Sequence, residues 1–339
     1  MFFPADYSVG MSNLGYHYIY RRLAELRVNV ERFFAVPIPH RSVDRDTLLE
    51  RFPVILASIS FEGDIPRFIG WLRSNGVDPS RRSRAVGSPI IGAGGAITYI
   101  NPLSLCGICD FIVLGDGIPV LDFAADVLRN ARSKDETLER LAEHPSILVP
   151  RIHIDRAAEG KLEISKSPDI SAEYGYGLWV TPGTVFGRTL LVELQRGCFR
   201  NCAYCALPNC FKPPRQRDLE LVRRDIAEAS ARCGFRQVGL VTPEAGDYRD
   251  LDDLLSYLES SGRAVSFASL RVDNLTETAV RALVRSGRRS VTIAPESGDD
   301  ELRAACGKRF TNDDIAETMV MTRKRGIIDV KLYFMIGLP

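Results

Sequence analysis

The sequence predicts an α/β protein in which a doubly wound parallel sheet is followed by part of a β/α barrel. Three observations lead to this prediction. Short apolar runs alternate with helical patterns over residues 1–150, proline and glycine interrupt the pattern over 151–188, and a regular strand–helix order fills 189–339. Apolar strands joined by helical crossovers are typical of parallel sheets. We therefore expect two domains separated by a connector.

Residues 1–150 are expected to fold as a doubly wound, flavodoxin-like sheet. Ligands of such sheets bind beyond the carboxyl ends of the strands. Ser58 lies at one expected strand end, and Gly94 and Gly95 lie at the next. Glycine lets a ligand approach the backbone closely, although an ordinary turn would also use it. The expected strands cover residues 28–34, 54–59, 89–92 and 111–114, and the expected helices include 14–26 and 65–74.

Residues 151–188 form the expected connector, because prolines and glycines there break any long element. A small hairpin is expected in it, with arms at 151–154 and 161–164. The chain ends directly after an expected strand, which would leave a sheet edge unpaired. We therefore expect further elements beyond Pro339, and a first strand that is clipped at Met1.

The second domain is expected to contain five strands that alternate with helices, as in a parallel barrel or part of one. A glycine follows the expected helices, as is usual where a helix ends in a left-handed residue. Thr311-x-x-Asp314 has the pattern of a capping box and predicts the start of a helix that ends at Gly326. The expected strands cover 190–194, 237–241, 265–268, 290–293 and 330–336, and the other expected helices cover 219–233, 251–260, 277–285 and 300–305.

Composition excludes several classes of function. The net charge is +1, so no global field favours nucleic acid or an anionic membrane. Basic runs at 81–84, 288–289 and 323–325 are interpreted as solvated surface charge. No apolar stretch reaches the roughly 20 residues that span a bilayer, and no signal peptide is recognisable. Eight cysteines in 339 residues without an export signal indicate reduced thiols and a cytoplasmic protein.

The chemistry-bearing motif is a C-x3-C-x2-C triplet formed by Cys198, Cys202 and Cys205. A [4Fe-4S] cluster is normally held by four cysteines, so three would leave one iron open to a small molecule. A zinc knuckle, or a cluster closed by Cys210, is the alternative. Zinc ribbons pair two CxxC units, and no second unit follows this one. Cys106-x2-Cys109 also has no partner pair and is interpreted as structural.

The triplet resembles the signature of the radical S-adenosylmethionine (SAM) superfamily, whose unique iron is chelated by the amino and carboxylate groups of SAM. Under this resemblance, 189–339 is the radical SAM barrel and 1–150 a cobalamin-binding-type domain fused ahead of it. Ser58 and the Gly94-Gly95 pair match the serine and glycine edges of that domain. The stretch Glu296-Ser297-Gly298, with Lys308 further on, resembles the ESG…K pattern of the cobalamin-associated and methylthiotransferase branches. The D-x-H-x-x-G motif that supplies a lower axial histidine is not found.

The resemblance also implies which residues bind SAM. Glu244 would accept from the SAM ammonium, although Thr242 and Pro243 replace the two glycines that precede this glutamate in the family. Arg271 would bind the carboxylate. Ribose hydroxyls and the adenine need further partners, for which we expect Ser269, Glu296 and the aromatic ring of Tyr204.

The function implied is a radical SAM enzyme that cleaves SAM reductively to a 5′-deoxyadenosyl radical, with cobalamin-dependent methyl transfer as a candidate outcome. An electron donor such as flavodoxin or ferredoxin would be its partner. A methylthiotransferase or rearrangement enzyme without cobalamin is the first alternative, and a non-enzymatic zinc or Fe-S binding module is the second. The sequence leaves the substrate open.

Overall fold

The computed structural model describes residues 1–36, 41–155, 162–267 and 270–338. The chain folds into two compact units, each with its own hydrophobic core. The first unit contains Met1–Pro168 and Gly183–Val185, and the second contains Asp169–Pro182 and Phe186–Pro339. The expected connector is therefore divided between the two units.

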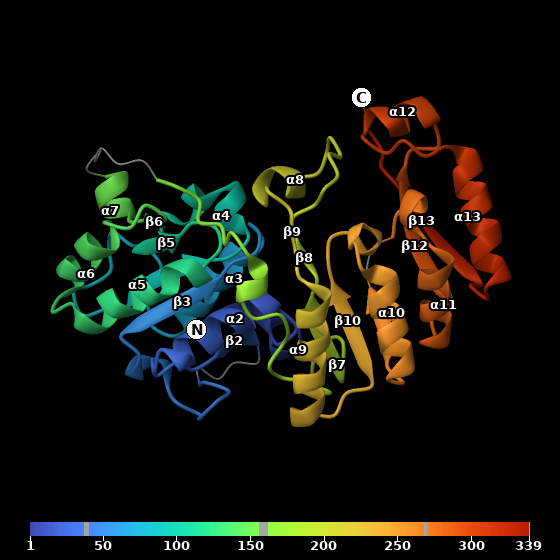
Figure 1. Ribbon diagram of the computed structural model, residues 1–339. Coiled ribbons are helices and arrows are strands. Elements are labelled where there is room, and N and C mark those ends of the chain that lie inside the picture. Colours follow the sequence, from blue (N-terminus) through green and yellow to red (C-terminus); the bar gives the residue numbers. More distant parts are fainter. Residues whose placement is uncertain (37–40, 156–161, 268–269, 339) are drawn as a thin grey trace. The chain divides into compact units, whose positions relative to one another are not determined.

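The first unit is built on a six-stranded sheet in the order β2-β1-β3-β4-β5-β6 (Figure 1). Neighbouring strands are parallel except β5 and β6, which are antiparallel. The first five positions follow the flavodoxin-like order 2-1-3-4-5, so the predicted fold class is confirmed. The strands are β1 (Phe2–Asp6), β2 (Phe33–Val36), β3 (Val54–Ser58), β4 (Ile90–Gly94), β5 (Phe111–Val113) and β6 (Ile147–Leu148).

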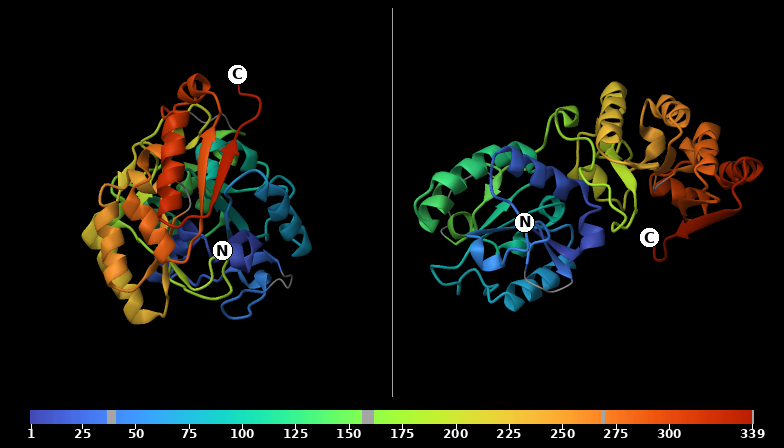
Figure 2. Two further views of the ribbon diagram at one scale, coloured as in Figure 1. Left: turned by 90° about the vertical axis from the view of Figure 1, so that its right-hand side faces the viewer. Right: turned by 90° about the horizontal axis from the view of Figure 1, so that it is seen from below.

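Helices cover both faces of this sheet, with α2 and α5 on one face and α3 on the other (Figure 2). The α3 face has an aromatic core in which the Phe2 ring centroid lies 4.0 Å from Trp71 and 5.3 Å from Phe68. Such stacked rings bury large apolar areas. The helices are α1 (Tyr7–Gly10), α2 (Leu14–Glu25), α3 (Asp64–Ser74), α4 (Ile97–Ile100), α5 (Ile118–Asn130), α6 (Lys134–Leu141) and α7 (Pro150–His153), with 3-10 turns at Leu49–Arg51 and Pro102–Leu105.

Three expectations for the first unit were wrong in detail. The expected strand at 28–34 begins only at Phe33. The first arm of the expected hairpin, 151–154, lies in helix α7, because Pro150 at the first helical position has a fixed φ that favours helix. Of the second arm, residue 161 lies outside the described residues, and 162–164 form no strand. The basic run 81–84 is not all solvated, since the Arg84 side chain is fully buried 3.1 Å from Asp110.

The second unit contains two groups of parallel strands. β7 (Thr189–Glu193), β10 (Gln237–Val241) and β11 (Ala264–Phe267) form a sheet in the order β11-β10-β7. β12 (Ser290–Glu296) pairs with β13 (Asp329–Phe334). A single parallel bridge between Leu270 and Ile293 connects the two groups. This strand order, which follows the chain, is that of a partial β/α barrel.

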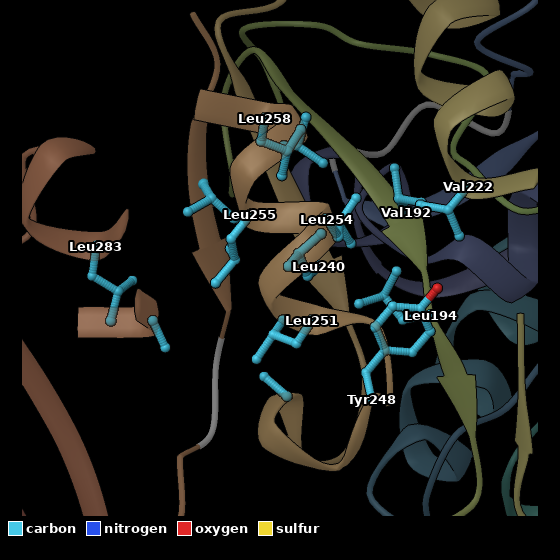
Figure 3. Packing of buried hydrophobic residues seen from close by; sticks show 14 of the residues in the cluster. Val192, Leu194, Val222, Leu240, Tyr248, Leu251, Leu254, Leu255, Leu258 and Leu283 are labelled. Atoms are coloured by element: carbon cyan, nitrogen blue, oxygen red, sulfur yellow. The ribbon is translucent and has the colours of Figure 1, made fainter. Parts of the chain in front are cut away.

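Helices follow the strands of the second unit and lie on one face of them (Figures 1 and 2). Leu254 and Leu258 of α10 pack near Leu240 of β10 in the core that joins helices to strands (Figure 3). The predicted capping box at Thr311 is confirmed, with reciprocal hydrogen bonds to Asp314. The helices are α8 (Leu207–Cys210), α9 (Leu219–Arg232), α10 (Leu251–Ser260), α11 (Glu277–Arg285), α12 (Asp300–Ala305) and α13 (Asn312–Lys324), with 3-10 turns at Ile170–Ala172, Ala245–Asp247 and Val272–Asn274.

Within the described parts of the chain, none of the helices combines the length and apolar character that crossing a membrane requires.

Candidate functional site

The three cysteines of the triplet lie on one loop, residues 197–214, which we call the Cys loop. An antiparallel ribbon closes its base, formed by β8 (Gln195–Arg196) and β9 (Arg215–Gln216). Gly197 opens the loop at φ +82, and a Cβ there would lie 2.4 Å from the Phe211 carbonyl oxygen. Only glycine fits this position without strain. The ribbon was not predicted, because two-residue strands leave no periodic pattern in the sequence.

Cys198, Cys202 and Cys205 are partly buried and carry free thiols. Burial raises the pKa of the Cys198 thiol, and the neighbouring thiols of Cys202 and Cys205 raise it further. The sulfur atoms of Cys202 and Cys205 therefore both lie within electrostatic range of Cys198 Sγ. The backbone N–H of Arg200 donates to Cys198 Sγ at 3.4 Å, a contact that stabilises a thiolate.

The thiols of the Cys loop are not arranged as the ligands of a single metal ion. Among the described residues, no three His, Cys, Asp or Glu side chains converge as the ligands of one ion would. In a cubane cluster each thiolate binds its own iron, so the predicted cluster does not require such convergence.

One side of the Cys loop contacts the end of β12. Tyr204 donates its hydroxyl to Glu296 Oε1 at 2.7 Å, and Lys308 Nζ donates to the same oxygen at 2.7 Å. Glu296 and Lys308 are buried, and Glu296 has φ +69. A non-glycine residue held at positive φ is strained, and such residues concentrate at functional sites. Partial burial, together with the bond to Glu296, raises the pKa of Tyr204.

The turn that follows α12 contacts the same side of the loop. The Ala203 N–H donates to the Cys306 carbonyl at 3.1 Å. Gly307 lies so close that a Cβ would be 2.8 Å from the Asn201 carbonyl oxygen and 3.1 Å from Cys202 Cα. Cys306 is buried and places its carbonyl against the loop.

The other side of the Cys loop is joined to the ends of β10 and β11 by charged pairs. Arg200 donates from Nε to both carboxylate oxygens of Asp247 at 3.0 Å. Asp247 also accepts from Asn274 Nδ2 at 2.6 Å, and Arg200 Nη1 lies 3.6 Å from Asp273. Sequence reasoning missed Arg200 and Asp247. Their only signal was their position, one inside the triplet and one three residues after Glu244.

Glu244 lies three residues after β10 and is buried, with 4% of its surface exposed. Its Oε1 accepts from the backbone N–H groups of Gly246 and Arg271, both at 3.3 Å. Burial raises the pKa of Glu244 to about 7, an effect that these two hydrogen bonds partly oppose. A carboxyl group with this pKa changes charge near neutral pH.

Arg271 is also buried, beside the Cys loop. Its Nε and Nη2 donate to the two carboxylate oxygens of Asp273 at 2.9 and 3.0 Å. Its Nη1 lies 3.8 Å from Cys202 Sγ. Ser269, the other predicted SAM ligand near this strand end, lies outside the described residues.

Arg303 is a further residue that sequence reasoning missed. Its side chain is fully buried beneath the turn formed by 296–298. It donates to the carbonyl oxygens of Ser297 at 2.8 Å and Phe310 at 2.9 Å, and to Asn312 Oδ1 at 2.6 Å. Because each partner would be left unsatisfied without it, Arg303 fixes the shape of the turn that carries Glu296.

The predicted binding edge of the first unit is formed by backbone and small residues at the ends of β3 and β4. Ser58 pairs in register with Gly94, where β3 and β4 end. Gly95 has φ +113, and a Cβ there would lie 2.3 Å from the Ile59 carbonyl oxygen. Thr98 Oγ1 donates to the Gly95 carbonyl at 2.8 Å and so holds the turn. The three residues predicted as a binding edge, Ser58, Gly94 and Gly95, therefore lie together.

Exposed apolar side chains occur in the segments that follow this edge. Phe61, three residues after β3, is 55% exposed. Ile100 and Leu103, which follow β4, are each 60% exposed. An apolar ligand that covered these side chains would remove apolar surface from water, which is favourable.

Two family models match the chain, one in each half. Residues 192–339 match the model described as the radical SAM superfamily. Residues 15–150 match the model described as the N-terminal domain of radical SAM proteins. The two matches cover the end of β7, the other barrel strands with the Cys loop, and most of the doubly wound sheet.

Similar proteins were found among curated sequences and solved structures. An uncharacterised protein of Methanocaldococcus jannaschii is 27% identical over 99% of this chain and 69% of its own length. The ribosomal protein uS12 methylthiotransferase RimO of Thermotoga maritima is 23% identical over 40% of this chain and 34% of its own length. The radical SAM methyltransferase TsrM of Kitasatospora setae, solved with cobalamin and a [4Fe-4S] cluster, has a TM-score of 0.63 at 15% identity, covering 98% of this chain and 68% of that chain.

Proposed function

We propose that this chain, a radical SAM enzyme with the N-terminal domain of radical SAM proteins, binds a [4Fe-4S] cluster through Cys198, Cys202 and Cys205 and cleaves SAM at it. The observation that carries this proposal is the Cys loop itself. Three thiols lie on one closed loop inside the region that matches the radical SAM model, and Cys202 and Cys205 both interact electrostatically with Cys198.

The donor set fits such a cluster. Thiolates are the usual protein ligands of Fe-S clusters, and three of them leave one iron for the amino and carboxylate groups of SAM. N–H donors near Cys198 and Cys202 suit sulfur atoms that carry negative charge. When bound and reduced by one electron, the cluster would supply the electron that splits SAM into methionine and a 5′-deoxyadenosyl radical.

The chain's own residues would bind and orient SAM. We assign the ammonium of SAM to Glu244, whose ionised carboxylate would attract a positive charge in a buried setting. Glu296 Oε1 already accepts from Tyr204 and Lys308, so a ribose hydroxyl would use the second oxygen. Tyr204 contributes an aromatic ring from the loop itself, and Ser269 remains a predicted ribose ligand.

Cobalamin-dependent methyl transfer is the finer proposal. Its support is the edge formed by Ser58, Gly94 and Gly95, where backbone and small side chains would allow a large flat ring to approach. The exposed Phe61, Ile100 and Leu103 add apolar surface after the same strands. TsrM, whose fold this chain shares, is a methyltransferase solved with cobalamin bound.

A methylthiotransferase without cobalamin is the second candidate. RimO and tRNA-2-methylthio-N(6)-dimethylallyladenosine synthase are similar to this chain over about two fifths of its length. Failure to bind hydroxocobalamin, with SAM cleavage intact, would favour this candidate. Either reaction needs a low-potential electron donor, for which we propose flavodoxin or ferredoxin.

The test is anaerobic reconstitution with iron and sulfide, followed by reduction with SAM and measurement of 5′-deoxyadenosine. The wild type should bind close to four irons and form the product. Cys202→Ala should lose both cluster and product. Cys233→Ala is the matched control, because Cys233 follows α9 and donates to the Ala229 carbonyl, away from the Cys loop. Product formation by Cys202→Ala, or one zinc per wild-type chain without iron, would refute the proposal.

A further inference from the structure

We propose that Arg271 sets the reduction potential of the cluster through the Cys202 thiolate. This inference rests on the proposed function and adds to it a residue that acts on a cluster ligand. Its geometric basis is one contact, in which Arg271 Nη1 lies 3.8 Å from Cys202 Sγ.

Two further groups fix the position of the Arg271 side chain. Asp273 accepts from Nε and Nη2 along one edge of the guanidinium group. The ring of Phe310 lies against it, with its centroid 5.7 Å from Cζ, a cation–π distance. With Nε and Nη2 engaged, Nη1 is the donor that faces the Cys loop. The guanidinium group is thus held in one orientation toward Cys202.

Arg271 is 8% exposed, so little water screens its charge from the sulfur atom. Reduction adds one negative charge to the cluster and its thiolates. A buried cation beside one thiolate stabilises the reduced form more than the oxidised form, because the attraction grows with the negative charge. Hydrogen bonds to the sulfurs and local charge are among the factors that set cluster potentials. Arg271 should therefore raise the potential.

Two carboxylates near the loop, Asp273 and Asp247, are each paired with an arginine. Asp273 binds the Nε and Nη2 edge of Arg271, and it also lies 3.6 Å from Arg200 Nη1. Asp247 is paired with Arg200. Nη1 of Arg271 takes no part in these pairs and is directed at a ligand sulfur. Arg271 should therefore act on the reduction potential through its proximity to Cys202 and not through the net charge around the loop.

The experiment is a potentiometric titration of reconstituted protein without SAM. The reduced cluster is monitored by electron paramagnetic resonance (EPR). Dithionite, which is oxidised to sulfite, supplies one electron per cluster. In Arg271→Gln we expect the midpoint potential to fall. In Arg271→Lys we expect a smaller fall, because an ammonium keeps the charge but cannot bind Asp273 with two donors and face Cys202 together. Arg224→Gln, at a side chain 59% exposed on α9, is the control and should leave the potential unchanged.

Iron content and SAM affinity are measured on the same samples. If Arg271→Gln does not retain a cluster, Arg271→Lys decides the question alone. A loaded variant with the wild-type potential would overturn the inference, and weaker SAM binding at that unchanged potential would assign Arg271 to the SAM carboxylate. A wild-type chain that binds no cluster would instead refute the proposed function, so the two failures are distinguishable.

Discussion

The two predicted binding edges of this chain differ in the kinds of residue that form them. In the first unit the edge consists of backbone and small residues, Ser58, Gly94 and Gly95, followed by exposed apolar side chains. In the second unit the edge consists of thiols and buried charges that already bind one another. The first edge suits a large, largely apolar ligand, while the second suits small charged groups. Ligand binding would therefore depend mainly on shape at the first edge and mainly on charge at the second.

Removal of Arg303 should give the largest loss of stability. It tests how far the second edge depends on buried charge. Arg303→Met leaves the Ser297 and Phe310 carbonyls and the Asn312 side chain without their donor. We expect a loss of about 3–4 kcal/mol in the free energy of unfolding. Urea denaturation of the metal-free protein measures it. A loss below about 1 kcal/mol would show that water replaces Arg303 without cost.

Gly95 tests the first edge in the same way. Gly95→Ala places a Cβ 2.3 Å from the Ile59 carbonyl oxygen at φ +113, and should cost about 2–3 kcal/mol. Gly94→Ala is the matched control, since its Cβ would meet Val113 only at 3.9 Å, an ordinary contact. The control should change stability by less than about 0.5 kcal/mol. Equal effects in the two variants would contradict the role of backbone shape.

Glu244 makes the stability of the second unit depend on pH. The pKa of Glu244 rises from 4.5 to about 7 on folding, so the folded chain binds the extra proton between these values. The contribution of Glu244 to the free energy of unfolding is therefore fully present below pH 4.5 and is lost as pH rises through about 7. Glu244→Gln should remove this slope and be more stable than wild type at pH 8 by roughly 2–3 kcal/mol.

Ligand binding should show the opposite trend with pH at the same residue. Ionised Glu244 attracts the SAM ammonium, so SAM should bind the wild type more tightly at pH 8 than at pH 6. Isothermal titration calorimetry of the reconstituted protein measures this difference. The Glu244→Gln variant should bind SAM weakly at both pH values, and an unchanged wild-type affinity would contradict the assignment.

Tyr204 gives the smallest expected effect. Tyr204→Phe removes the hydroxyl that donates to Glu296, while Lys308 still binds the same oxygen. Because Tyr204 is 43% exposed, we expect a loss of only about 1 kcal/mol in thermal or urea unfolding. Tyr257→Phe on α10 is the control and should change stability by less than about 0.5 kcal/mol. Indistinguishable variants would mean that the hydroxyl does not hold the Cys loop to β12.

Local signals in the sequence predicted much of the fold. Helices α10, α11 and α12 begin and end where apolar spacing and caps placed them. Helix α7 was missed because the apolar residues around Ile152 also suit a strand, and only the N-terminal proline distinguishes the two. The ribbon of β8 and β9 was missed because its strands are only two residues long and pair across the whole Cys loop, as Gln195 does with Gln216.

The candidate site was predicted less completely, for a related reason. A triplet of cysteines is visible in the sequence because its members are neighbours. The partners of Arg200 and Arg303 lie on other elements, and no local pattern pairs an arginine with Asp247 or with the Phe310 carbonyl. Glu296 was predicted as a hydroxyl ligand, but its bonds to Tyr204 and Lys308 depend on how β12 meets the Cys loop. The roles assigned to these residues remain predictions.

The most direct measurement of the central claim is EPR of the reduced, reconstituted protein with and without SAM. If Cys198, Cys202 and Cys205 hold a cluster with one open iron, SAM should change the spectrum of the wild type. In the same experiment the Cys233→Ala control should behave as wild type. A spectrum of a reduced cluster that SAM leaves unchanged would contradict the open iron, and with it the proposed cleavage of SAM at the cluster.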